Sequence, residues 1–162
     1  MPIGGAPLIQ GIYKDYVCVR DKKAQNTDGG TFTSGAWRTR DINEELADTA
    51  NICSIASNQI TLAAGTYRCL ISCPALAVGR HQTRLYDITN SATLLTGSSE
   101  WSNQNYGDQT RSVLVGRFTL AAQTVLEIQQ RSEYSANLVG FGVACGFTDE
   151  IYTIAEFWRE AS

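Results

Sequence analysis

The stretch ITLAAGTYRC, from Ile60 to Cys69, decides the fold of this chain together with a matching stretch, FTLAAQTVLEIQ, from Phe118 to Gln129. In each, a short apolar strand is followed by an Ala-Ala turn and a second strand that alternates apolar and polar residues. Alternation with a period of two is typical of a half-buried strand, because successive side chains point to opposite faces of a sheet. The two hairpin-like units predict an all-β protein built as a β-sandwich.

Further strand-like segments surround these two units, with turn formers between them. We expect strands at 16–21, 36–46, 51–55, 59–62, 65–73, 83–88, 92–95, 113–120, 125–131, 138–147 and 151–160. The segment 36–46 could instead begin a helix, but its apolar residues lack the spacing of three and four that a helix needs. A long polar loop is expected at 97–108. The sequence therefore predicts about ten strands in a single domain, residues 15–162.

Composition excludes several classes of protein. Charged residues make up only 18% of the 162, the net charge is −3 and the pI is about 5.1. Such a chain has no basic surface for nucleic acid, and it has no apolar run near the ~20 residues of a membrane helix. No targeting segment is visible, so we expect the protein in the cytoplasm where it is made. Low charge also fits a subunit whose surface is partly hidden in an assembly.

The first 14 residues predict an arm that docks on something. Glycine and proline disfavour regular structure there. Its apolar side chains are Ile3, Leu8, Ile9, Ile12 and Tyr13, too many for a solvated tail. We expect the arm to lie on its own domain, on a neighbouring subunit or on a larger platform.

Residues that could carry catalysis or hold a metal are few. His81 is the single histidine, no G-x-S-x-G motif accompanies it, and we expect it to be a surface or hydrogen-bonded residue. The acidic cluster from Asp41 to Asp48 lacks the glycine and the downstream glutamate of a calcium loop, which favours a solvated acidic edge. The sequence thus predicts neither an enzyme nor a bound metal or cofactor.

The small residues of the chain are expected to serve packing. The cysteines are Cys18, Cys53, Cys69, Cys73 and Cys145. Each lies in an apolar, strand-like stretch, so we expect reduced, buried thiols that resist modification in the native state. The glycine-rich segment GFGVACG (140–146) is expected inside a strand, where small residues let another backbone approach, at a symmetry axis in the more specific interpretation.

Three aromatic residues stand in polar surroundings: Trp101, Tyr106 and Tyr134. Exposed aromatic rings provide contact area at a low entropy cost, so these residues are candidates for a surface-recognition loop that binds a host-surface glycan or a protein. The alternative is that the loops pack on their own domain.

The strings GTFTSGAWRTRDIN (30–43), SNQITLAAGTY (57–67) and HQTRLYDIT (81–89), with the ending FGVACGF..EIYTIAEFWRE, resemble a domain of bacteriophage structural proteins. That domain occurs at the end of tail fibres and as small virion proteins. The phrases ITL-x-x-GTY and FTLAAQTVLEIQ are also similar to the globular heads of complement and tumour-necrosis-factor-like trimers. These resemblances imply a ten-stranded jelly roll that trimerises through an apolar inner sheet.

Three functions follow as hypotheses. The first is a capsid decoration or cement protein, a homotrimer docked on the major capsid protein of a virion assembled in the host cytoplasm. The second is the receptor-binding tip of a tail fibre, attached to a tail or fibre protein. The third is an enzyme such as a depolymerase, which is disfavoured because no pair of carboxylates marks a cleft. The short arm and the lack of a stalk-forming repeat favour decoration over a tip.

Overall fold

The computed structural model describes residues 11–161 and is all-β in this part of the chain. Its eleven strands are β1 (Tyr13–Lys23), β2 (Arg38–Thr39), β3 (Glu44–Asp48), β4 (Cys53–Ala56), β5 (Gln59–Leu62), β6 (Gly65–Leu76), β7 (Gly79–Asp87), β8 (Ala92–Ser102), β9 (Gln109–Leu120), β10 (Thr124–Ser132) and β11 (Glu150–Glu160).

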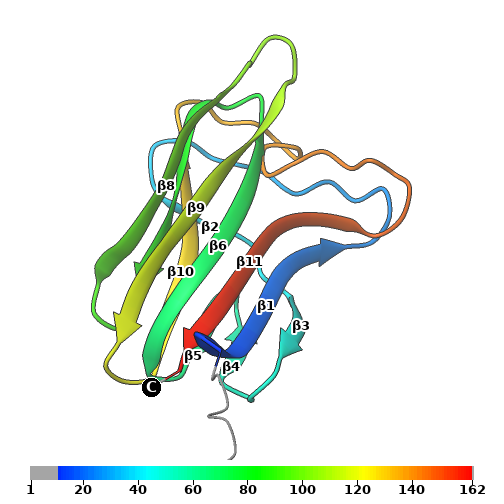
Figure 1. The fold of residues 1–162 in the computed structure, drawn as a ribbon. Coiled ribbons are helices and arrows are strands. Elements are labelled where there is room, and N and C mark those ends of the chain that lie inside the picture. The colour runs from blue at the N-terminus through cyan, green and yellow to red at the C-terminus, as the bar shows by residue number, and fades with distance from the viewer. Residues whose placement is uncertain (1–10, 162) are drawn as a thin grey trace, which may run out of the picture.

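The strands form two antiparallel sheets packed as a jelly-roll sandwich (Figure 1). A five-stranded sheet has the order β3-β1-β11-β6-β9, and a six-stranded sheet has β4-β5-β10-β7-β8 with β2 paired to β10. The edge strands β8 and β9 lie side by side, where Ser112 Oγ donates to the carbonyl of Ser98 (2.7 Å) and the Val113 amide donates to Ser98 Oγ (2.9 Å). One side of the sandwich is therefore closed by polar contacts between the sheets.

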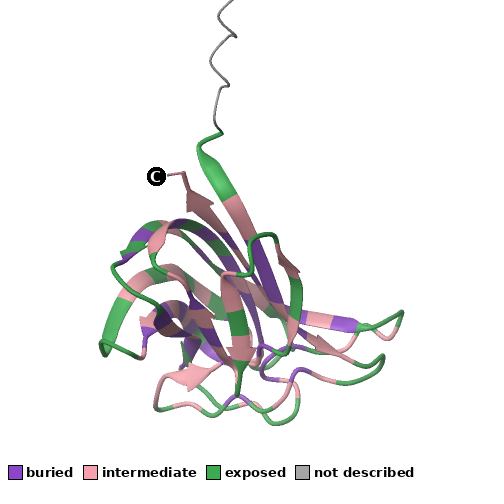
Figure 2. Ribbon diagram, turned by 90° about the horizontal axis from the view of Figure 1, so that it is seen from below, coloured by how far each residue is buried: buried purple, intermediate pink, exposed green. Residues whose placement is uncertain are grey.

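The core lies between the two sheets, and Figure 2 shows buried residues alternating with exposed ones along the strands. Alternate residues of β6 are buried, namely Tyr67, Cys69, Ile71 and Cys73, as the alternation of the sequence predicted. From the facing sheet the core receives the buried side chains of Ile60, Leu62, Leu85, Leu126 and Ile128.

The two matched stretches are corners between the sheets and not hairpins, which corrects the expectation from the sequence. β5 and β6 lie in different sheets, and so do β9 and β10. The units pair with each other: Leu62 of β5 lies opposite Thr124 of β10, and Gly65 of β6 lies opposite Leu120 of β9. Local alternation does not reveal the partner of a strand, so a corner and a hairpin give the same pattern.

Other boundaries also differ from the prediction. The segment 138–147 is not a strand but a loop, in which Gly142 has a φ of +131° and a Cβ on Gly140 would lie 2.8 Å from the amide nitrogen of Phe32. Its glycines do permit close packing, but against the chain's own segment at 29–32. The stretch 36–46 is broken into β2 and β3, and the polar loop is confined to 103–108 because β8 continues to Ser102.

Candidate functional site

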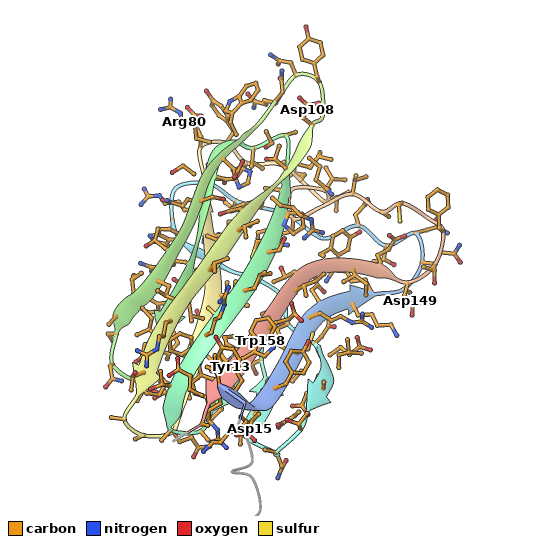
Figure 3. The ribbon with its side chains drawn as sticks, in the orientation of Figure 1. Tyr13, Asp15, Arg80, Asp108, Asp149 and Trp158 are labelled. Atoms are coloured by element: carbon orange, nitrogen blue, oxygen red, sulfur yellow. The ribbon has the colours of Figure 1, made fainter. Side chains whose placement is uncertain are left out.

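The described end of the arm lies beside the C-terminal strand. Ile3, Leu8 and Ile9 fall outside the described residues. Ile12 is 76% exposed, and its carbonyl accepts from the Ala161 amide (2.9 Å). Tyr13 already belongs to β1, opposite Glu160. Figure 3 places Tyr13 and Trp158 near this end of the sandwich and Arg80 near the opposite end.

The aromatic residues expected in recognition loops gather at that opposite end. Tyr106 lies in the loop 103–108 and is 83% exposed. Trp101 is half exposed but lies on β8, opposite Arg80 of β7, and not in a loop. A groove lined by Trp101, Tyr134, Arg80 and residues 103–105 brings two of the three aromatics together. Tyr106 is not part of it.

A larger hollow that sequence reasoning missed lies next to this groove. It has a volume of about 600 Å³ and is lined by residues from β7, β8, the end of β10 and the loop at 35–37. The outward-facing side chains of Arg131, Gln82 and Ser99 lie in one row across β10, β7 and β8, since each is the register partner of the next. Trp37 lines the same hollow, while the Arg84 guanidinium stacks on its ring at 4.3 Å. Only the register between distant strands could have revealed this row.

His81 is buried and hydrogen-bonded at both ring nitrogens. Gln130 Nε2 lies 3.0 Å from Nδ1, and Nε2 lies 2.8 Å from Thr110 Oγ1. Because Arg40 donates to Gln130 Oε1, the Gln130 amide must donate to Nδ1, which fixes the neutral tautomer with its proton on Nε2. Burial lowers the pKa of His81 to about 4. The ring therefore acts as a structural hydrogen-bonding group, which is one of the two roles that the sequence predicted for it.

Arg40 is the largest fully buried side chain of the described residues. Its guanidinium donates to Thr153 Oγ1 (2.8 Å) and Gln130 Oε1 (3.1 Å) and also to the carbonyls of Pro74 and Phe141 (both 3.0 Å). It thereby joins β6 and β11 of one sheet to β10 of the other. Burial lowers the pKa of Arg40, and the four acceptors compensate for the lost hydration.

The acidic cluster lies on and before the edge strand β3, where its acidic residues are exposed or half-buried as expected, and several of its side chains are also paired. Asp41 Oδ2 accepts from Lys23 Nζ at 2.7 Å, and Glu44 pairs with Arg20. Asp48 accepts from the amides of Ile52 and Cys53 (3.0 and 2.8 Å) and so fixes the loop before β4. Over residues 11–161, no three His, Cys, Asp or Glu side chains are grouped in a way that could hold a metal ion.

The cysteines are all free thiols, but they are not all buried. Cys18, Cys69 and Cys73 are buried, and burial raises the pKa of Cys69 to about 12. Cys145 is exposed, because the segment around it is a loop and not the expected strand; its Sγ lies 3.3 Å from Glu150 Oε2. The expectation that every cysteine is buried is therefore wrong for Cys145, and Cys53 is only half-buried.

The outer face of the five-stranded sheet carries a group of apolar side chains. We call it the apolar outer face, made of Leu70, Val113, Val115, Ile154 and Trp158. Leu70 lies between Val115 of β9 and Glu156 of β11 in the sheet. Val115 is 53% exposed and Leu70 is 37% exposed. A patch of this kind on a small domain usually marks a contact with another protein surface.

No protein-family model and no curated protein matches this chain. Among solved structures it is similar to the globular domain of zebrafish complement 1qA protein, with 15% identity, a TM-score of 0.53, and 90% of this chain and 97% of that one covered. Murine APRIL gives 7% identity and a TM-score of 0.59 over 90% and 98% of the two chains. Vertex protein P5 of phage PRD1 gives 11% identity and a TM-score of 0.55 over 93% and 100%. At these identities the likeness establishes the fold, a complement and tumour-necrosis-factor-like jelly roll.

In residues 11–161 no helix is long and apolar enough to cross a membrane.

Proposed function

We propose that this protein is a non-enzymatic structural protein of a phage virion, a homotrimeric decoration protein docked on the outer shell. The observation that carries the proposal is the apolar outer face, which lies on a sheet whose other side already forms the core. The resemblance of the sequence strings to phage virion domains and the likeness in fold to a phage vertex protein support the location.

The trimer is supported by the chemistry of the apolar outer face. An obligate interface resembles a core cut in half and is more apolar than ordinary surface. Leu70 and Val115 are adjacent in the sheet and exposed, so a neighbouring subunit would remove them from water. Leu70, Val113 and Val115 are 37–53% exposed, so burying the remainder of each contributes only part of the roughly 1.5–3 kcal/mol that a fully exposed side chain of this size would contribute. Repeated in three subunits, these contributions favour assembly.

Docking is assigned to the arm, residues 1–14. Residues 11 and 12 lead away from the end of the sandwich opposite the loop 103–108 (Figure 1). In a trimer with parallel subunits, three arms would leave from the same end. Their binding would then be reinforced by effective concentration, so weak contacts per arm would suffice.

The alternative function is the receptor-binding tip of a tail fibre. It is favoured by the exposed aromatic side chains at the end away from the arm, namely Trp101, Tyr106, Tyr134 and Phe147. Exposed rings of this kind are common in surfaces that bind other molecules. Both functions share the trimer and differ in what the two ends contact.

Three measurements test the proposal. Sedimentation should give a trimer, and a folded monomer of 17.7 kDa at micromolar concentration would exclude it. A protein lacking residues 2–12 should remain a folded trimer but no longer associate with particles. Undiminished occupancy on virions would contradict the role of the arm. Gold labelling that marks fibre ends instead of the head would replace decoration with the tip.

A further inference from the structure

We propose that the hollow between β7, β8, the end of β10 and the loop at 35–37 is a binding site for an uncharged saccharide. The proposal does not depend on the virion role, because it stands on the side chains that line this hollow. Its volume of about 600 Å³ lies within the range of small-molecule sites, roughly 300–1,000 Å³.

The row across the three strands provides fixed hydrogen-bonding directions. Both amide hydrogens of Gln82 are used, because Nε2 donates to the carbonyl of Gly97 (3.0 Å) and to Ser99 Oγ (3.3 Å). Gln82 Oε1 therefore remains as an acceptor, and Ser99, which already accepts, keeps its hydroxyl proton to donate. Arg131 is exposed and pairs with no carboxylate among the described residues. The row thus reads donor, acceptor, donor.

The row suits a sugar because its donors and acceptors lie on neighbouring strands, with Gln82 Nε2 only 3.3 Å from Ser99 Oγ. Each ring hydroxyl of a hexose can both donate and accept a hydrogen bond. Trp37 adds an apolar surface on one side: Arg84 covers one face of its ring but does not line the hollow, so another part of the indole faces the ligand. Aromatic side chains with polar neighbours combine these two kinds of contact.

Charge balance indicates an uncharged ligand. Arg80 and Glu133 neutralise each other through two hydrogen bonds, from Nε (3.2 Å) and Nη2 (2.9 Å). Glu100 and Arg131 also line the hollow, so its four charged residues, two arginines and two glutamates, sum to zero. A phosphate or a nucleic-acid strand would therefore find no net positive charge to bind it. A polyhydroxylated ring needs only hydrogen-bond donors and acceptors, which do not have to carry a charge.

The test uses the full-length protein and the methyl glycosides of glucose, galactose and mannose, followed by saturation-transfer NMR and by the shift of the Trp37 indole N–H. At least one glycoside should bind in the millimolar range, as expected for a ligand of this size. Arg131→Met should weaken binding about tenfold, since a charged hydrogen-bond donor is lost. Ser99→Ala should weaken it a few-fold. Thr96→Ala, on the same strand but outside the hollow, is the matched control and should leave binding unchanged.

Three results would overturn the site. One is the absence of saturation transfer and of any indole shift for all three glycosides. Another is binding that survives both Arg131→Met and Trp37→Ala but is lost in Trp101→Ala, which would move the ligand to the neighbouring groove. A third is binding of methyl glucuronide alone, which would show that Arg131 selects a carboxylate and that the ligand class is wrong.

Discussion

The outer faces of the two sheets differ in how their side chains are satisfied. On the six-stranded sheet, polar side chains bond across strands: Gln59 donates to Glu127 at 3.0 Å, and Arg84 donates to Gln129 at 2.9 Å. On the five-stranded sheet, Leu70 and Val115 are exposed side by side. Single exposed apolar residues are common on proteins, but a contiguous apolar group is not. The six-stranded sheet thus presents a polar face to water, and the apolar face of the five-stranded sheet is the one that we propose to be covered by a second copy of the chain.

The substitution Leu70→Glu should remove the difference between the two outer faces most directly. The new carboxylate would lie opposite Glu156 in the sheet, and like charges directly across a strand pair are destabilising. Repeated in three subunits at a desolvated contact, it should weaken assembly at least about a hundredfold, since a buried unpaired charge costs several kcal/mol. Sedimentation velocity over a concentration series measures the shift from trimer to monomer.

The matched control for Leu70→Glu is Thr96→Glu, on an exposed position of β8 in the other sheet. It adds the same charge to the face that we assign to solvent and should leave the trimer intact. If both variants dissociate equally, or if neither does, the two faces are equivalent and the assignment of the apolar outer face is wrong.

The interior also differs from one end to the other, because the buried Arg40 guanidinium and its acceptors make one end polar while the other end is apolar. Replacing Arg40 with Met leaves four buried acceptors without a donor, so unfolding should become easier by about 3 kcal/mol. Arg38→Met is the matched control: within residues 11–161 its guanidinium donates only to the carbonyls of Thr33 and Ser34, in a partly exposed loop, and the loss should stay below about 1 kcal/mol.

Urea unfolding of both variants at one fixed concentration measures this difference, since trimer stability depends on concentration. Equal unfolding free energies for the Arg40 and Arg38 variants would show that water can replace the Arg40 guanidinium without loss of stability.

Period-two alternation was enough to predict the class of fold and the buried face of β6, because burial of every second residue is a local property. The pairing of strands is not local, so the corners at 63–64 and 121–122 were expected as hairpins. The loop 138–147 was expected as a strand because it is apolar, although positive φ at Gly142 prevents extension. The row of Arg131, Gln82 and Ser99 was missed because strand pairing is not local: the row exists only through the register of three strands.

The polar end of the interior should also make stability depend on pH through His81. Its folded pKa, about 4, lies below the ordinary value of 6.5, so the unfolded chain binds more protons between these values. The contribution of His81 is therefore complete above pH 6.5, falls as the pH drops toward 4, and changes no further below it. The total loss is about 3 kcal/mol.

His81→Gln isolates this effect from the carboxylates. The difference in unfolding free energy between the native protein and the variant should change between pH 6.5 and 4 and be constant outside that window. A difference that does not vary with pH across the window would mean that the buried ring does not titrate as described.

The smallest expected effect concerns the thiols, which compare the interior of the sandwich with its loops. Cys69 and Cys73 point from β6 into the core, where burial raises the pKa of each thiol, whereas Cys145 is exposed in the loop before β11. The thiolate is the reactive form, so a disulfide reagent should modify Cys145 in the native protein and reach the two core thiols at least about a hundredfold more slowly, only through opening of the sandwich. Mass spectrometry after digestion identifies the modified residue.

The variant Cys145→Ser should remove the fast phase of modification and change the unfolding free energy by less than about 1 kcal/mol. A fast phase that persists in that variant, and maps to Cys69 or Cys73, would mean that the buried face of β6 opens readily and that the two sheets are less tightly packed than their interior implies.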